Sequence, residues 1–155
     1  MEIVRLVEKH FKEVSRLNLS VHKLHVEWYP EIFKELSEAE LEKCLRDYFD
    51  DKTAGGFTAF IEGEVAGYVL FRRRDHEENS FQKARSFLYI DQIGVREDLR
   101  GRGTGKALLD EVKSEALKMG DVRLALEVWA NNKNAQSFFR SEGFAPFCGW
   151  MVFEG

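Results

Sequence analysis

The chain has 155 residues, of which 44% are hydrophobic and 32% are charged, and its formal net charge at pH 7 is −4. This composition excludes a disordered chain and is typical of one soluble globular domain, here residues 1–155. The acidic balance argues against nucleic acid as a partner and is compatible with a cationic substrate. No stretch of the sequence approaches the ~18 apolar residues that a membrane-spanning helix needs, so no membrane partner is expected.

The first third of the chain predicts a short strand and two helices. Residues 3–6 are β-prone, and apolar residues then recur at three- and four-residue spacing over residues 11–24, which is one face of a helix. Ser37 followed by Glu40 is a capping box that predicts the start of a second helix. The glycine pair at 55–56 is predicted to close this helical hairpin.

The rest of the chain predicts a mixed sheet. Strand signals cover residues 57–61, 65–71, 86–95 and 122–129, and residues 144–153 are predicted to form a final β region. Amphipathic helices are predicted after the third and fourth of these strands. The order is therefore β-α-α-β-β-β-α-β-α-β, an α/β fold of the α+β type with a mixed sheet in a single domain.

Several polar and reactive residues have ordinary structural interpretations. Cys44 and Cys148 lack a C-x-x-C partner, so we expect two buried free thiols in a cytoplasmic protein. The N-terminus lacks the features of a secretory signal, which supports the same compartment. His22 and His25 have a metal-like spacing but no evident third ligand, and no metal site is predicted.

Two further segments allow more than one interpretation. The arginine run at 72–74 is interpreted as a solvated strand end that the acidic stretch 75–78 neutralises. The aromatic and acidic residues of 25–33 join the first two helices. They either receive a cation-bearing ligand or anchor the loop on the core.

The glycine turn, residues 100–106 with the sequence Arg-Gly-Arg-Gly-Thr-Gly-Lys, carries the strongest functional signal. It lies between a predicted strand and a predicted helix. Its glycines free the backbone to present successive N–H groups at the helix N-terminus, where the helix dipole favours an anion. Arg100, Arg102 and Lys106 add positive charge, so the pattern predicts a phosphate or pyrophosphate ligand.

Two known phosphate motifs fit this turn poorly. A P-loop has four residues between its first glycine and its Gly-Lys pair, whereas only three separate Gly101 from Gly105, and Ala107 replaces the hydroxyl residue that would hold magnesium. A Rossmann fingerprint would need glycine at Lys106 and a place near the first strand of a parallel unit. A plain charged glycine turn and a nucleotide-binding protein remain alternatives.

A family resemblance gives the turn a more specific interpretation. Arg100-x-x-Gly103-x-Gly105 resembles the acetyl-CoA signature of the GNAT superfamily, the Gcn5-related N-acetyltransferases. Downstream, Asn132-x-x-Ala135-x-x-Phe138-Phe139-x-x-x-Gly143-Phe144 resembles the second cofactor-binding segment of that family. The two segments lie one helix and one strand apart and together cover residues 87–145. The first half of the chain matches only in the order of its elements.

The resemblance implies an acetyl-CoA-dependent N-acetyltransferase that moves an acetyl group to a primary amine by direct attack, through a tetrahedral intermediate. It further implies that two central strands splay apart beside the pantetheine arm, that the glycine turn holds the pyrophosphate, and that Asn132 bonds to the arm or the phosphates. The implied cofactor-binding residues are Ile93, Gly94, Val95, Arg100, Gly101, Arg102, Gly103, Thr104, Gly105, Lys106, Asn132, Ala135 and Phe138.

Acetyl transfer needs a base, because only about one in 10³ amines with a pKa of ~10.4 is neutral at pH 7. Asp91 is the leading candidate, since it interrupts an apolar strand where several members of the family carry an acidic base, although a solvated position is an equally good interpretation. Glu127 on the next strand is the second candidate. The N–H of Ile93, or of a near neighbour, would stabilise the oxyanion.

Phe139 departs from the family, in which many members carry a tyrosine at this place as the general acid. Either the thiolate leaves unassisted, since its thiol has a pKa of ~8.5, or one of Tyr29, Tyr48, Tyr68 and Tyr89 serves instead. A non-catalytic acyl-CoA-binding or regulatory module is therefore an alternative. The expected acceptor is a small-molecule amine or a protein or peptide amine, and a homodimer is possible.

Overall fold

The computed structural model describes residues 1–120 and 122–153, and it places five strands in one sheet in the order β1-β2-β3-β4-β5. Each strand is antiparallel to its neighbour except β5, which joins β4 in parallel. The sheet is therefore mixed, as the sequence predicts. The strands are β1 (Glu2–Arg5), β2 (Ala54–Ile61), β3 (Glu64–His76), β4 (Arg85–Val95) and β5 (Arg123–Leu126).

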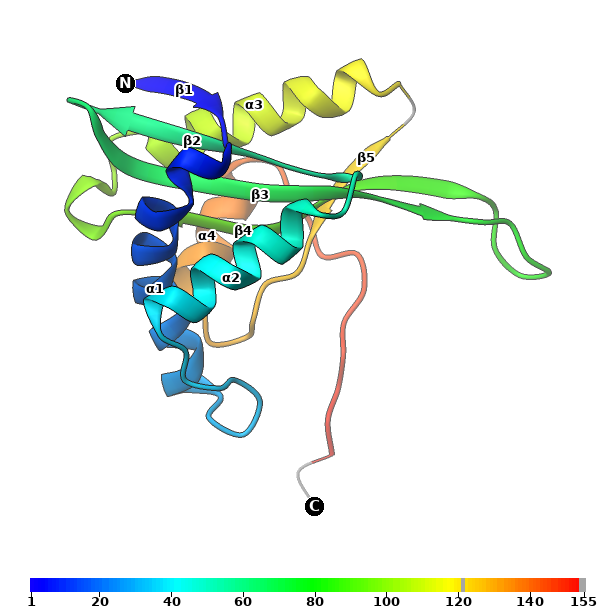
Figure 1. Cartoon of the computed structure of the whole chain (residues 1–155). Helices are drawn as coiled ribbons and strands as arrows, with labels where there is room; N and C mark the ends of the chain where they lie inside the picture. Colours follow the sequence, from blue (N-terminus) through cyan, green and yellow to red (C-terminus); the bar gives the residue numbers. More distant parts are fainter. Residues whose placement is uncertain (121, 154–155) are drawn as a thin grey trace.

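Helices cover both faces of this sheet (Figure 1). On one face, α1 (Phe11–Trp28) and α2 (Glu38–Phe49) enclose a core built around Val14, Leu45 and Tyr68. On the other face, α3 (Thr104–Lys118) encloses a larger core built around Leu88 and Leu108, and α4 (Lys133–Ser141) packs Phe138 at its margin. Short 3-10 turns, η1 (Glu8–His10) and η2 (Glu97–Leu99), precede α1 and the glycine turn.

The ends of two helices follow the sequence signals. The Ser37 hydroxyl accepts a hydrogen bond from the N–H of Glu40 (3.3 Å), and the Glu40 carboxylate accepts one from the N–H of Ser37 (2.8 Å), which confirms the capping box. Gly143 follows α4 with a φ of +91°, the left-handed conformation that ends helices. Within the described residues, no helix combines the length and apolarity needed to cross a bilayer.

The predicted limits of three strands need correction. The glycine pair 55–56 lies inside β2 rather than in a turn, because a Cβ at Gly56 would come within 2.9 Å of the Val69 carbonyl oxygen and only glycine permits this approach. β3 extends through the arginine run to His76, because those residues pair with the first part of β4. β5 stops at Leu126, where its pairing with β4 ends.

Two other predictions are wrong. Residues 144–153, which we call the C-terminal segment, form no strand within the part of the chain that the structure describes, because no neighbouring strand pairs with them. Cys44 and Cys148 are exposed rather than buried. The buried stripe of α2 runs through Leu41 and Leu45, one position away from Cys44, and Cys148 lies in the C-terminal segment.

The loop between α1 and α2 is anchored by aromatic side chains, but on the segment after β5 rather than on the core. The ring centroids of Tyr29 and Phe33 lie 4.8 and 5.0 Å from that of Trp129. The Tyr29 hydroxyl accepts a hydrogen bond from the N–H of Asn131 (3.1 Å). Residues some hundred positions apart in the sequence are thereby held together, which favours the anchoring interpretation of residues 25–33.

His25 belongs to the same aromatic group, and its ring lies 5.2 Å from that of Phe33 and 5.8 Å from that of Trp28. Burial lowers the pKa of His25 from its ordinary value of 6.5. The folded state therefore favours the neutral ring more strongly than the unfolded chain does, and the unfolded chain takes up a proton below about pH 6.5. The resulting contribution to stability is complete above this pH and is lost as the pH falls below it.

We expect His25→Gln to make the fall in unfolding free energy between about pH 7 and pH 5 shallower than in the wild type. Urea unfolding at a series of pH values measures this slope. His76→Gln, on an exposed ring at the end of β3, is the matched control and keeps the wild-type slope. Identical slopes for all three proteins would show that His25 does not link the anchored loop to pH.

Candidate functional site

The fourth and fifth strands stay together over only part of their length. Residues Phe87–Ile90 of β4 pair with Arg123–Leu126 of β5, and β4 then continues to Val95 without a partner on that side among the described residues. This is the separation of central strands that the resemblance implies. We call residues 91–95 along this side the open edge of β4.

A β-bulge marks the point where the open edge begins. The register between β3 and β4 shifts after Ile90, which leaves Asp91 as an extra residue without a partner on β3. A bulge places two successive side chains on the same side of the sheet. Asp91 and Gln92 accordingly both reach the α1–α2 face, where Asp91 bonds to Tyr48 and Gln92 accepts a hydrogen bond from Asn18 (2.9 Å).

The backbone N–H and C=O groups of the open edge point alternately toward β3 and toward the unpaired side. The N–H of Arg96 donates to the carbonyl of Ala66 (2.9 Å), so the polar groups of every second residue from Arg96 point toward β3. Those of Gly94 therefore bond to β3, and those of Ile93 and Val95 point outward. Two residues of the predicted arm-binding trio thus present free backbone groups, to which an extended ligand can add like a strand.

The glycine turn leads into the N-terminus of α3. Gly101 and Gly103 have φ values of +76° and +82°, and Gly103 is the N-cap, with no side chain capping the first N–H groups. Arg100 and Arg102 are exposed and form no ion pair with a described residue. The Thr104 hydroxyl is buried and has no hydrogen-bond partner among the described residues. Uncapped N–H groups and two available cations fit a polyphosphate ligand.

The start of α3, the end of β4 and α4 meet at Gly105. A Cβ on Gly105 would lie 3.4 Å from the ring of Phe138 and 3.6 Å from the side chain of Val95. Asn132 is the N-cap of α4, and its side-chain oxygen accepts a hydrogen bond from the N–H of Ala135 (3.1 Å). The NH2 group of Asn132 is therefore the part left to donate to a ligand.

Lys106 makes a different contribution from the two arginines of the turn. Its ammonium lies 3.3 Å from the carboxylates of Asp110 and Glu142, and Glu142 also binds Lys113 (3.1 Å). Hydrogen bonds to Asp110 and then to Glu142 raise the pKa of Lys106. Asp110 lies on α3 and Glu142 directly follows α4, so the Lys106 side chain holds the two helices together through Glu142, and its backbone N–H is the group available to an anion.

Asp91 lies at the centre of a hydrogen-bonded group on the α1–α2 face. Its carboxylate accepts hydrogen bonds from the Tyr48 hydroxyl (2.8 Å), from Nε of Arg72 (2.8 Å) and from a terminal nitrogen of Arg74. Burial, followed by the charge of Asp91, raises the pKa of Tyr48. Both oxygens of Asp91 are thus occupied as acceptors, and only 16% of its side chain is exposed.

The structure corrects the interpretation of the arginine run, residues 72–74, as a solvated strand end. Alternation along β3 sends Arg72 and Arg74 to the face of Asp91 and sends Arg73 to the other face, where it pairs with Asp75 (2.9 Å). Only Arg73 is neutralised by the acidic stretch, as expected. The two-residue period was the signal in the sequence that could have identified Arg72 and Arg74 as partners of Asp91.

Glu127 and Tyr89 lie next to this group. Tyr89 pairs across the sheet with Ala125, and Glu127 follows two residues later, directly after the end of β5. The Tyr89 hydroxyl is buried and makes no well-formed hydrogen bond to a described residue, yet burial and then the nearby Glu127 carboxylate raise its pKa. Glu127 is exposed and forms no ion pair within the described residues. Asp91 and Glu127 therefore both lie where the open edge begins.

Phe139, at the position where the resemblance would lead one to expect a tyrosine, lies in apolar surroundings. Phe139 is 6% exposed, and its ring packs against those of Phe138 (5.2 Å) and Phe144 (5.5 Å). Of the four tyrosines, Tyr48 bonds directly to Asp91, and Tyr89 is near Glu127. These two have the hydroxyls that lie beside the candidate carboxylates.

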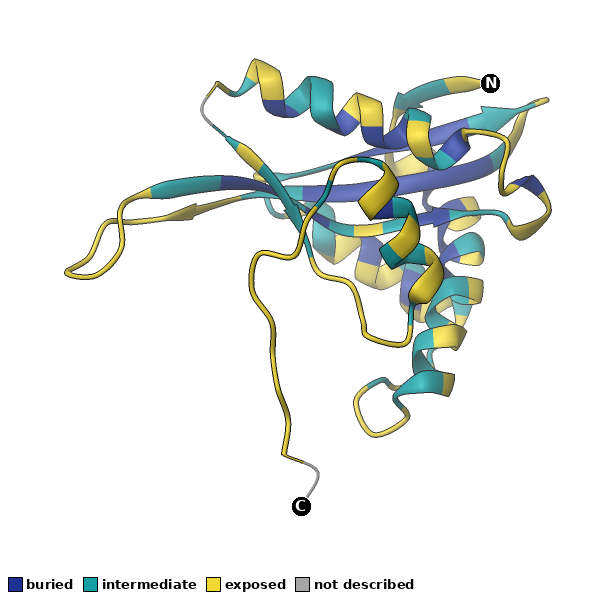
Figure 2. Ribbon diagram, turned by 180° about the vertical axis from the view of Figure 1, so that it is seen from behind, coloured by how far each residue is buried: buried dark blue, intermediate teal, exposed yellow. Residues whose placement is uncertain are grey.

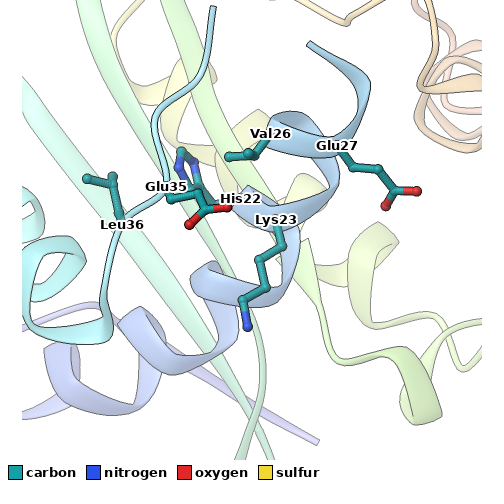
Figure 3. Close-up of a pocket in the computed structure, with 6 residues that line it drawn as sticks. All are labelled: His22, Lys23, Val26, Glu27, Glu35 and Leu36. Carbon is teal, nitrogen blue, oxygen red and sulfur yellow. The ribbon is translucent and has the colours of Figure 1, made fainter. Parts of the chain in front are cut away.

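A hollow of about 340 Å³ lies elsewhere, between α1 and the loop before α2 (Figure 3). The side chain of His22 points into this region, and its Nε2 lies 2.6 Å from the carbonyl oxygen of Lys34. The residues that line the hollow are His22, Lys23, Val26, Glu27, Glu35 and Leu36. None of them belongs to the open edge or to the glycine turn.

Comparison with known proteins gives this geometry a family. The model of the acetyltransferase (GNAT) family matches residues 18–144. The chain is 32% identical over 97 residues to an uncharacterized N-acetyltransferase of Lactobacillus delbrueckii subsp. lactis, covering 61% of this chain and 55% of that protein. It is 30% identical to the L-ornithine N5-acetyltransferase NATA1 of Arabidopsis thaliana, covering 76% of this chain and 45% of that one. The chain thus spans about half the length of these relatives.

Solved structures share the fold. A crystal structure of a mutant BH1408 protein from Bacillus halodurans has a TM-score of 0.93 at 21% identity, covering 99% of this chain and 98% of that one. An aminoglycoside N-acetyltransferase solved in complex with CoA has a TM-score of 0.76 at 16% identity, covering 99% and 93%. Because the family model matches residues 18–144, which is most of this chain, the chain belongs to the GNAT family of acetyltransferases.

Proposed function

We propose that this protein is an acetyl-CoA-dependent N-acetyltransferase that moves an acetyl group to a primary amine. The observation that carries the proposal is the continuity between the open edge of β4 and the glycine turn. Outward-pointing backbone groups at Ile93 and Val95 lead directly to the uncapped N-terminus of α3. An extended amide-containing arm that ends in a pyrophosphate, such as the one in CoA, matches this order of donors and acceptors.

The named relatives support the same reaction class. The Arabidopsis relative is named for acetylation of ornithine, and one structural neighbour was solved with CoA. Both names describe transfer to an amine. We therefore propose as the acceptor a small-molecule amine, or an amine of a protein or peptide, in a cytoplasmic enzyme.

In the proposed reaction the amine attacks the thioester directly, and a carboxylate removes its proton. The neutral amine attacks the thioester carbonyl carbon and forms the C–N bond, and the resulting tetrahedral intermediate collapses as the C–S bond breaks and the thiolate leaves with the electron pair. We place the oxyanion at the outward N–H of Ile93 or a near neighbour. The surplus proton of the amine goes to a carboxylate, directly or through water.

The contacts favour Glu127 as that base. The sequence favours Asp91, but its oxygens already accept hydrogen bonds from Tyr48, Arg72 and Arg74. Three of the roughly four lone-pair positions of this carboxylate are therefore occupied, which leaves less room for an incoming proton than at Glu127. Glu127 has no cation paired with it among the described residues, so its lone pairs are available. In this proposal Asp91 positions the two arginines, and Glu127 accepts the proton.

The donor site predicts a specific defect. Replacing Arg100 and Arg102 together by alanine is expected to raise KM for acetyl-CoA about tenfold or more while kcat changes little, because each charged hydrogen bond contributes roughly 1.5–3 kcal/mol. Arg85→Ala, at the opposite end of β4, is the matched control and keeps the wild-type KM. Steady-state kinetics with thiol release as the readout measures both. An unchanged KM in the double variant would place the pyrophosphate elsewhere.

The two candidate bases are separated by their pH profiles. Glu127→Gln is expected to lower kcat by about 10²-fold or more near pH 7. This deficit should shrink as the pH approaches the pKa of the amine, ~10.4, because most of the substrate is then already neutral and needs no base. Asp91→Asn is expected to lower the melting temperature, because it weakens the pairing of two arginines. Glu78→Gln, in the exposed β3–β4 loop, serves as the control.

If Asp91→Asn lowers kcat by about 10²-fold with an unchanged melting temperature while Glu127→Gln keeps the wild-type kcat, the base is Asp91.

The apolar surroundings of Phe139 keep one other function open, a module that binds acyl-CoA without catalysis. Tight CoA binding without thiol release across a panel of amines would support that module and contradict the proposed enzyme.

A further inference from the structure

Two guanidiniums share the single carboxylate of Asp91. Arg72 donates to it through Nε (2.8 Å), and Arg74 donates through one terminal nitrogen. Arg72 has a second carboxylate within reach, that of Asp51 at 3.4 Å, whereas Arg74 forms an ion pair with no described carboxylate other than Asp91. A guanidinium that shares its one counter-ion with a second guanidinium is suited to bind a further anion.

The Arg74 side chain keeps hydrogen-bond donors available to a ligand. A guanidinium carries several N–H groups, and only one nitrogen of Arg74 donates to any residue that the structure describes. β3 is exposed from Arg74 onward, where the strand leaves the body of the sheet toward its loop with β4 (Figure 2). The exposed fraction of the side chain is 42% for Arg74 and 32% for Arg72. Arg74 is therefore the more accessible of the two.

The orientation of Arg74 is fixed before any ligand binds. Its guanidinium carbon lies 3.7 Å from the centre of the Tyr89 ring, which is a cation–π contact. Asp91 holds one edge of the same group. Because it is held from two directions, the guanidinium gives up little conformational freedom on binding. Its planar fork of donors matches the two oxygens of a carboxylate.

Tyr89 connects this cation to the candidate base. Arg74 lies over the face of the Tyr89 ring, and Glu127 lies near its hydroxyl, where burial and then the Glu127 charge raise the pKa of Tyr89. A cation and a carboxylate thus lie at the face and at the tip of one aromatic side chain. A small molecule that carries both an amine and a carboxylate can contact the two groups together, with each of its charges beside the opposite one.

We propose that the acceptor is a free amino acid, or another small amine that carries a carboxylate, and that Arg74 binds this carboxylate while the amine lies at Glu127. The inference rests on the proposed function and names the acceptor of the same site. It also gives a purpose to the positioning of Arg74 by Asp91. In a folded protein the corresponding carboxylate is part of a peptide bond, so a protein amine is the less suitable acceptor.

Kinetics with paired acceptors test the proposal. Each free amino acid of a panel with acidic, basic, small and aromatic side chains is compared with its amide, in which a neutral carboxamide replaces the carboxylate. Arg74→Gln is expected to lower kcat/KM for the free acid about tenfold or more, mostly through KM, and to leave that for the amide near its wild-type value. Arg73→Gln, on the opposite face of β3, is the matched control and should change neither.

Binding separates this inference from the reaction itself. The same acids and amides are titrated by calorimetry into the protein saturated with CoA. At least one acid is expected to bind about tenfold or more tightly than its amide, and Arg74→Gln should remove the difference. Wild-type protein that binds no acid more tightly than its amide would overturn the carboxylate site, as would an Arg74→Gln variant that keeps the wild-type preference.

The two proposals fail in different ways. Thiol release with amines that lack a carboxylate, without any preference for the acids, would keep the acetyltransferase and reject the role of Arg74. Binding that depends on the carboxylate and on Arg74, without thiol release from acetyl-CoA, would support the carboxylate site and contradict the proposed enzyme. The comparison of acid with amide in the wild-type protein needs no variant, so the test does not depend on how Arg74→Gln folds.

Discussion

The site depends on a single constraint in the sheet: β4 cannot continue to pair with β5 beyond Ile90. The bulge at Asp91 inserts one residue at this point, and β5 ends opposite it, at Leu126. Backbone N–H and C=O groups that would otherwise complete a ladder are left pointing outward at Ile93 and Val95. Unpaired backbone groups carry a free-energy cost when water is excluded, so this edge is suited to a ligand that supplies the missing strand.

The packing around the edge maintains this arrangement. A Cβ on Gly94 would lie 2.7 Å from the ring of Tyr68, and one on Gly67 would lie 2.9 Å from the carbonyl oxygen of Gly94. The two glycines therefore let β3, β4 and the buried tyrosine approach closely. The Tyr68 hydroxyl in turn donates to Gln92 (3.3 Å), whose side chain the bulge has turned to this face. Close packing fixes the strand that carries the open edge.

Charge is divided between the two ends of the site. At one end the glycine turn combines the helix N-terminus with Arg100 and Arg102, which suits the phosphates of a donor. At the other end Asp91 and Glu127 lie beside the point where the strands separate, which suits a cationic amine that must lose a proton. Under the proposed function, this division would let one chain with a net charge of −4 bind an anionic donor and a cationic acceptor in the same reaction.

The parts of this account that the sequence predicted are those specified by local signals. The glycine turn, the capping box at Ser37 and the order of elements through α4 each depend on residues close together in the chain. The contacts of Asp91 depend on a bulge and on two arginines about 17 to 19 residues away, which no local pattern determines. The final strand failed as a prediction because the β-propensity of residues 144–153 provides no neighbour to pair with.

Titration of the isotope-labelled protein with CoA, followed through the backbone amide resonances, tests the central claim most directly. The account predicts the largest shifts at the outward amides of Ile93 and Val95 and along Gly101 to Lys106, with β1 and β2 nearly unchanged. Saturating shifts that gather instead around the hollow at His22 and Leu36, with the open edge of β4 unaffected, would contradict it.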